Sequence, residues 1–253
     1  MILRITTLIL FLLIIKPTFA GDIKLDADER VEYHQKEQKL VAKGNAIATK
    51  DNLTIKASTL IGYYNPKTKN KISRVDAISN VIMISPEASA WGDKMVYDVK
   101  LDTATLTGNP AKIKTNDATI TSKGPITYYQ SKQKAIAKEN VTATDSKGNK
   151  VYADLMTAWF TKDSDNKLVL DKIDIEKNVK IISSDTTITA LRGTYYAKSN
   201  TVKLFDNVVI NQNDNILKGA QAETNLNTGI SKILSSGSKS RVSGVFKEKK
   251  KKE

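Results

Sequence analysis

Apolar and polar residues alternate along most of this chain of 253 residues. The alternation is clear in runs such as Leu53–Ala57, Ala118–Thr121, Val151–Leu155 and Val179–Ile181. Successive side chains of a β-strand point to opposite faces, so this pattern places one face against a core and the other in water. No stretch beyond residue 20 sustains a helical period. The pattern predicts an all-β fold of antiparallel strands.

The alternating runs belong to a repeat that is most easily recognised by its asparagines. Each unit contains an aromatic residue, a polar turn, an alternating run that ends in asparagine, and a second alternating run. The marker asparagines are Asn45, Asn80, Asn109, Asn140, Asn178 and Asn207. A repeat of roughly 20 to 50 residues indicates stacked supersecondary units, none of which buries its apolar face alone. Asparagine tolerates positive φ, so each marker predicts a bend or bulge where a strand turns between two sheets.

The first residues have the pattern of an export signal. Arg4 provides a positive charge, Ile5–Ile15 is mainly apolar, and Thr18–Ala20 ends in the small residue that signal peptidase requires. The apolar run is well short of the roughly 20 residues that span a bilayer. Residues 1–20 are therefore predicted to be a cleaved signal peptide, with a retained anchor as the alternative.

Composition narrows the possible chemistry. The chain has no cysteine and one histidine, His34, so we expect neither a catalytic nor a zinc or copper site, and no cofactor. The formal net charge of +13 favours anionic partners such as lipid phosphates or acidic sugars. A surface that only keeps sheet edges soluble would also account for the lysines. Nucleic acid is not expected as a partner, because the chain is exported and lacks an arginine-rich face.

The apolar positions of the predicted interior are mostly aliphatic and small. Such side chains leave room between two sheets, which lipid tails would fill; a dry, well-packed core is the alternative. The candidate lipid-binding residues are Leu53, Ile55, Leu106, Ile113, Ile120, Ile175, Val179, Ile181 and Ile188.

Stacked units also leave an open sheet edge at each end. Strand addition satisfies unpaired backbone groups, and two different ends join head to tail instead of closing as a symmetric dimer. The candidate assembly residues are Ile23, Leu25, Val31, Val208, Ile210, Ile230 and Ile233.

Val31-x-Tyr33 followed by Leu40–Ala46 is the unit closest to a known pattern, in which Gly-Asn follows the first alternating run. Together with the export signal, the repeated units resemble the LptA/OstA-like family of lipopolysaccharide-transport proteins. The resemblance implies an open, twisted, V-shaped β-jelly roll in two sheets over residues 21–234, followed by a basic, disordered tail over residues 235–253. The chain departs from the pattern where glycine would precede asparagine, at Glu139, Lys177 and Asp206.

The function that the resemblance implies is non-enzymatic transport in the periplasm. Members hold the lipid A acyl chains of lipopolysaccharide between their sheets and associate head to tail. They link an inner-membrane ABC transporter complex to an outer-membrane translocon. Two alternatives stay open: a membrane-anchored, LptC-like partner of the inner-membrane transporter, and an exported polysaccharide-binding β-solenoid. The solenoid would require a carboxylate cluster and aromatic platforms, which the sequence does not show.

Overall fold

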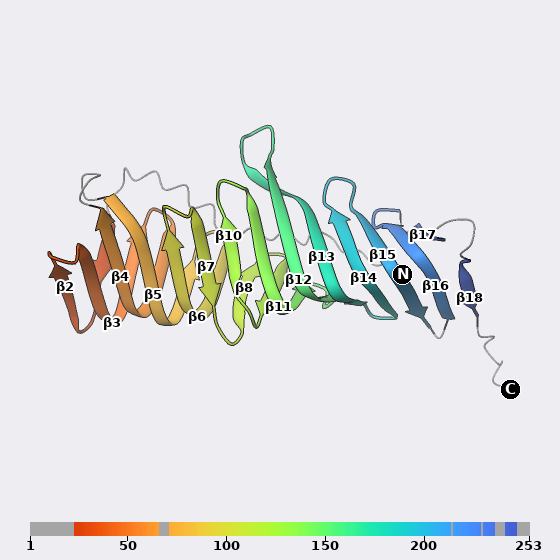
Figure 1. Cartoon of the computed structure of the whole chain (residues 1–253), viewed down its shortest axis with the longest axis horizontal. Helices are drawn as coiled ribbons and strands as arrows, with labels where there is room; N and C mark the ends of the chain where they lie inside the picture. The colour runs from red at the N-terminus through yellow and green to blue at the C-terminus, as the bar shows by residue number, and fades with distance from the viewer. Residues whose placement is uncertain (1–22, 66–70, 214, 229, 236–240, 247–253) are drawn as a thin grey trace.

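The computed structural model describes residues 23–65, 71–213, 215–228, 230–235 and 241–246. These residues form 18 β-strands in one antiparallel sheet (Figure 1), so the all-β prediction is confirmed. No helix in this part of the chain could span a membrane. The predicted signal peptide, residues 1–20, lies outside the described residues. The strands are β1 (Lys24–Asp26), β2 (Arg30–His34), β3 (Lys39–Lys50), β4 (Leu53–Asn65), β5 (Lys71–Ile84), β6 (Ala88–Asp98), β7 (Thr103–Thr107), β8 (Ala111–Thr115), β9 (Ala118–Ser122), β10 (Ile126–Tyr129), β11 (Lys134–Asp145), β12 (Lys150–Lys162), β13 (Leu168–Ile182), β14 (Thr186–Tyr196), β15 (Thr201–Gln212), β16 (Asn215–Asn225), β17 (Ser231–Leu234) and β18 (Ser243–Val245).

The sheet folds on itself into two layers because the long strands cross from one layer to the other. The first half of β3 pairs with β2, whereas its second half pairs with β1. Layer A contains β2, β7, β10, β17 and the strand halves bonded between them; layer B contains β1, β8, β9, β18 and the other halves. The two predicted sheets are therefore one hydrogen-bonded sheet. Its antiparallel pairing also disagrees with a β-solenoid, whose coils would stack in parallel.

The marker asparagines lie at the corners between the layers, as the repeat predicts. The register of β13 against β14 shifts between Glu176 and Val179, and the intervening Lys177 and Asn178 have φ of +64° and +54°. The same pair of positive φ values recurs at the corners of four other strands, at Gly44-Asn45, Ser79-Asn80, Glu139-Asn140 and Asp206-Asn207. Glycine is therefore not required at Glu139, Lys177 or Asp206, whose backbones adopt the left-handed conformation nonetheless. At Asn109 the corner instead divides the strand into β7 and β8.

Side chains of three corner asparagines, Asn45, Asn80 and Asn178, tie their corners to neighbouring segments. Asn45 Nδ2 donates to Asp28 Oδ2 over 2.8 Å, and Asn178 Nδ2 donates to Asp154 Oδ2 over 2.6 Å. This bond explains why asparagine, and not only glycine, is used at these positions: it tolerates positive φ and supplies a donor.

The core lies between the layers and is narrowest at the corners. Alanines occupy inward positions beside the corners, and Ala42, Ala46 and Ala77 are completely buried. Because alanine projects little, the two layers approach closely there and diverge toward the opposite side, which we call the mouth. The V-shape follows from the size of the inward side chains.

The C-terminal edge differs from the prediction. Val208 and Ile210 lie on β15, which pairs with both β14 and β16, and both side chains are buried. They are core residues, and their assignment to an edge was wrong because the sheet continues beyond them. The edge consists of β17 in layer A and β18 in layer B. Since β18 lies within the segment predicted as a disordered tail, the sheet also extends past residue 234.

Candidate functional site

An apolar cavity of about 450 Å³ opens between the two layers at the N-terminal end of the molecule. This volume lies within the roughly 300–1,000 Å³ that is usual for ligand cavities. The turns at residues 50–52 and 85–87 border the mouth of the cavity. Its main apolar walls are Ile23, Leu25, Leu53 and Ile55 from layer B and Leu40, Leu60, Val75 and Tyr97 from layer A.

Gly62 helps to keep this space open. It lies on β4 between Leu40 and Val75, in a row of inward-facing residues. A Cβ added at Gly62 would meet no atom within 4 Å. At Gly193, by contrast, an added Cβ would come within 2.6 Å of Leu204 Cδ2. Gly62 thus omits a side chain from the cavity, whereas Gly193 belongs to a closed part of the core.

The cavity suits an apolar ligand. Its tyrosines do not contribute charge, since burial raises the pKa of Tyr64 and Tyr97 above the ordinary value. In the described part of the chain no three histidine, aspartate or glutamate side chains could jointly hold a metal ion. The arrangement provides apolar surface and space.

The structure divides the nine candidate lipid-binding residues into three groups. Leu53 and Ile55 line the cavity. Leu106 and Ile113 border a separate space of only about 20 Å³, and the other five are buried in the packed core: Ile120, Ile175, Val179, Ile181 and Ile188. All nine side chains face or pack against the interior, but their role in lipid binding stays a prediction.

Aromatic side chains help to close the C-terminal part of the interior. Tyr128 and Phe160 are buried in edge-to-face contact, with ring centroids 6.3 Å apart, and Tyr195 is buried further along. Large rings fill volume that small aliphatic residues leave empty. Sequence reasoning missed Leu40, Gly62 and the other layer A walls of the cavity. The available signal was Gly62 itself, because glycine inside an alternating run often marks a close approach or a missing side chain.

Free sheet edges form the second candidate site. At the N-terminal end, Ile23 and Val31 are exposed on or beside the edge strands β1 and β2, and Leu25 packs against the core. At the C-terminal end, Ile230 is exposed beside β17, and Ile233 on β17 packs against the core. These positions agree with the predicted edges, although assembly through them stays a prediction.

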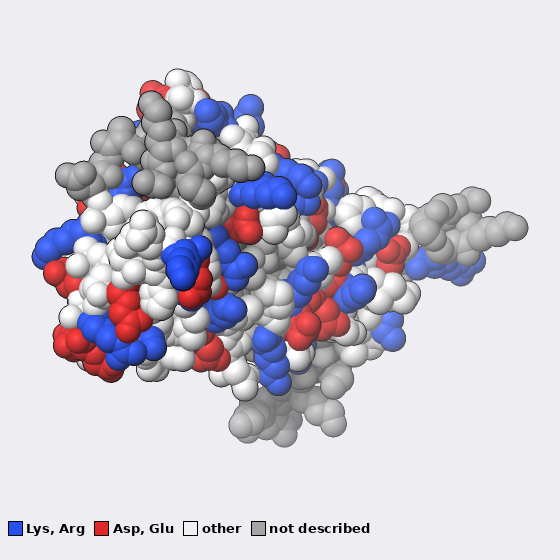
Figure 2. Space-filling view, turned by 60° about the vertical axis from the view of Figure 1, so that its left-hand side comes forward, with Lys and Arg blue, Asp and Glu red and all other residues white. Residues whose placement is uncertain are grey.

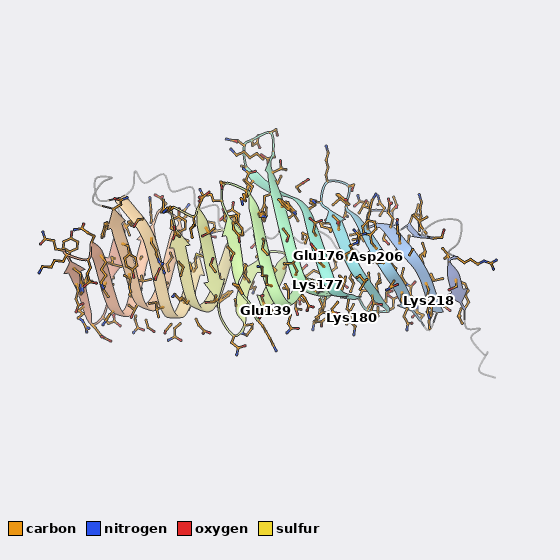
Figure 3. All side chains as sticks on the ribbon, viewed as in Figure 1. Glu139, Glu176, Lys177, Lys180, Asp206 and Lys218 are labelled. Atoms are coloured by element: carbon orange, nitrogen blue, oxygen red, sulfur yellow. The ribbon has the colours of Figure 1, made fainter. Side chains whose placement is uncertain are left out.

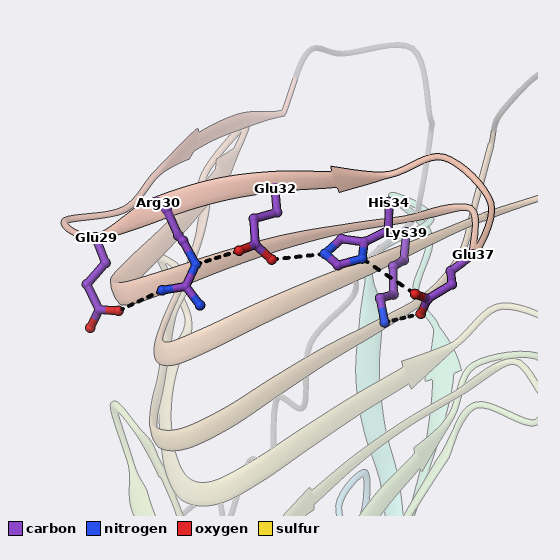
Figure 4. A network of polar contacts seen from close by, with 6 residues as sticks. All are labelled: Glu29, Arg30, Glu32, His34, Glu37 and Lys39. Atoms are coloured by element: carbon purple, nitrogen blue, oxygen red, sulfur yellow. Dashed lines mark hydrogen bonds and ion pairs between the residues drawn. The ribbon is translucent and has the colours of Figure 1, made fainter.

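The outer side of β2 carries a chain of polar contacts (Figure 4). Arg30 Nε donates to Glu32 Oε1 over 2.6 Å, and His34 Nε2 lies 2.9 Å from Glu32 Oε2. His34 Nδ1 also lies 3.5 Å from Glu37 Oε1, and Glu37 pairs with Lys39. Hydrogen bonds from His34 and then Arg30 lower the pKa of Glu32. Acidic and basic side chains therefore stand next to one another at this end of the molecule (Figure 2).

Comparison with known proteins identifies the family of the chain. The family model described as "LptA/(LptD N-terminal domain) LPS transport protein" matches residues 24–134 and again residues 124–230. No curated protein sequence matches the chain significantly. Among solved structures, one match is LptH, described as the LptA homologous periplasmic component of the conserved lipopolysaccharide transport device from Pseudomonas aeruginosa; it is 12% identical, covers 90% of this chain and 96% of its own, and has a TM-score of 0.23. Because the two matched segments span nearly all of the described sheet, the chain belongs to the LptA/LptD N-terminal-domain family of lipopolysaccharide-transport proteins.

Proposed function

We propose that this protein carries lipopolysaccharide through the periplasm without enzymatic activity, with the lipid A acyl chains in the cavity at the N-terminal end. The observation that carries the proposal is the largely apolar space between the layers, bordered by Leu53, Ile55 and Gly62, with its charged lining residues Lys50, Asp51 and Glu87 confined to the turns at the mouth. Burial of apolar surface contributes roughly 25 cal/mol per Å², so several acyl chains provide a large driving force. The polar mouth leaves sugars and phosphates in water.

Site-specific photo-crosslinking tests the location of the acyl chains. A crosslinker at Ile55, in the cavity wall, should capture lipopolysaccharide, whereas one at the neighbouring Lys56 should not, because Lys56 faces outward. Gly62→Phe should fill the cavity and reduce capture at Ile55. Lys56→Phe adds the same ring on the outer face and serves as the matched control. Equal capture at Ile55 and Lys56, or undiminished capture in a folded Gly62→Phe protein, would contradict the proposal.

The same proposal includes a bridge between the membranes, formed by head-to-tail self-association. Strand directions support it. Strands alternate in direction across each layer, so β2 is antiparallel to a copy of β17, and β1 is antiparallel to a copy of β18. Both layers would therefore continue across a junction without a change in the antiparallel pattern. The N-terminal edge would meet the inner-membrane ABC transporter complex, and the C-terminal edge the next copy or the outer-membrane translocon.

Cysteine crosslinking tests this junction. Because the chain has no natural cysteine, any disulfide must form between the introduced residues. Glu32 on β2 and Lys232 on β17 lie in the same outward row, so a junction that continues the row places them opposite each other. Glu32→Cys with Lys232→Cys should give oxidised ladders of oligomers, while either single variant should give at most dimers. Ladders that also form when Lys232→Cys is replaced by Lys218→Cys, on an inner strand, would argue against edge pairing.

A further inference from the structure

The outward faces of the two layers differ in charge. On layer A, acidic residues are interleaved with basic ones along the outward rows: Glu32, Asp76, Asp98, Asp174, Glu176 and Glu223. Several form ion pairs, including Arg74 with Asp76 over 2.5 Å and Lys172 with Asp174 over 2.9 Å. The positive charge of this face is therefore partly neutralised by its own carboxylates.

Layer B also has one such ion pair, between Lys24 and Asp26 on its edge strand β1, but from β3 onward its outward face has no such compensation. Its two outward rows run between β3 and β16 and consist of lysine, threonine, serine, asparagine, aliphatic and aromatic residues, without one carboxylate among them. Six exposed lysines stand in these rows: Lys56, Lys112, Lys114, Lys150, Lys180 and Lys218. None of the six forms an ion pair with a described residue.

Four of these lysines are close together at the centre of the layer. Lys112 and Lys114 lie on β8, Lys150 on β12 and Lys180 on β13, and only β9 and β11 separate β8 from β12. At about 4.8 Å between strands, they occupy roughly 20 Å of the sheet. Lys112 Nζ also lies 5.0 Å from the ring centre of Trp91, beside the same patch. Lys180 and Lys218, both labelled in Figure 3, lie on the layer B halves of β13 and β16.

We infer that the outward face of layer B docks on a membrane surface that contains anionic phospholipid. The charge complementarity is direct, because this face presents uncompensated lysines and a membrane of anionic lipid presents many negative headgroups. The lysines are spread over an open sheet face and do not converge in a pocket, which suits a surface better than a single phosphate ligand. Trp91 and Tyr152, in the same rows, are the aromatic residue types that favour the membrane interface.

The inference is independent of lipid transport in the cavity, since it concerns the opposite side of the sheet. It assigns the protein, when it is not joined to other copies in the bridge, an orientation at the membrane, with layer B toward the lipid and the salt-bridged face of layer A toward water. Binding of this kind is electrostatic and is weakened by salt, because each lysine acts within about a Debye length.

Sedimentation with lipid vesicles tests the inference. The purified protein is used without the predicted signal peptide, residues 1–20. The protein should bind vesicles of phosphatidylcholine with phosphatidylglycerol at low ionic strength, and should bind pure phosphatidylcholine weakly. Each lysine near an anionic surface changes affinity by roughly five-fold. Lys112→Gln, Lys150→Gln and Lys180→Gln together should therefore weaken binding on the order of 100-fold.

A matched triple on the other face controls for net charge. Lys94, Lys138 and Lys232 are exposed on layer A, and their replacement by glutamine removes the same charge. This variant should keep most of the binding, and so should Gly62→Phe, which blocks only the cavity. Equal losses in the two triples, equal binding to both kinds of vesicle, or binding to soluble polyphosphate but to neither vesicle would overturn the inference.

Discussion

Replacement of Lys177 by glycine should stabilise this protein, although the substitution removes a side chain and frees the backbone. Lys177 occupies a corner with φ of +64°, in the left-handed region, and its side chain is exposed. The corresponding position in the first repeat is Gly44, with φ of +82°. The corner backbone therefore has a conformation that favours glycine, although the sequence has lysine at this position.

Two opposing terms determine the magnitude. A residue with a Cβ in the left-handed conformation costs about 1–2 kcal/mol, which glycine avoids. Glycine in turn costs about 0.5–1 kcal/mol because it has more freedom in the unfolded chain. The expected net gain for Lys177→Gly is about 0.5–1 kcal/mol, which corresponds to a rise in Tm of at most about 2–4 °C in a chain of this size.

The opposite substitution should destabilise the first corner. Gly44→Ala introduces the same left-handed cost, and its Cβ would lie 2.8 Å from the backbone nitrogen of Glu29 and 2.6 Å from Glu29 Cγ. The backbone contact cannot be relieved by a change of rotamer. We expect a loss of about 2 kcal/mol or more.

Urea denaturation measures both changes as shifts of the midpoint at unchanged slope. Lys177→Ala is the matched control, because alanine also removes the long side chain but retains the Cβ in the left-handed conformation. We expect Lys177→Gly to be more stable than both Lys177→Ala and the natural protein. A midpoint for Lys177→Gly at or below that of Lys177→Ala would refute it.

Three further predictions concern other parts of the sheet. Asp174→Ala should cost about 2 kcal/mol in urea denaturation, because its carboxylate accepts hydrogen bonds from Trp159 Nε1 and Lys172 Nζ over 2.8 and 2.9 Å; a change near zero would contradict this. Ile126→Ala should cost about 2–5 kcal/mol, because the side chain is 1% exposed, and a loss below 1 kcal/mol by the same assay would show that the core relaxes around it. The pKa of Glu32 lies below its ordinary value of 4.5 in the folded protein. The hydrogen bonds of its carboxylate therefore stabilise the fold above pH 4.5, and this stabilisation is lost as the pH falls through the folded-state pKa. An NMR titration should show this pKa rise in His34→Ala, and an unchanged value would exclude His34 as its main cause.

The sequence alone determined the features that depend on local conformation. Period-two alternation specifies strands regardless of what they pack against, and asparagine at Asn45 or Asn178 specifies a corner because its backbone tolerates positive φ. The repeat also indicates the family without any information from the tertiary structure. These inferences succeeded because each depends on a few neighbouring residues.

Only the tertiary structure decided which interior is open and which strand is an edge. Ile55 and Ile181 are both inward residues of alternating strands, yet one lines a cavity and the other is enclosed in the core, because the side chains opposite them differ in size. Val208 looked like an edge residue until β16 was seen to pair beyond it. The uncompensated charge of layer B likewise arises from rows that run across the strands. Each row brings together residues that are far apart in the sequence. Such properties are set by pairing between distant segments, so no local pattern contains them.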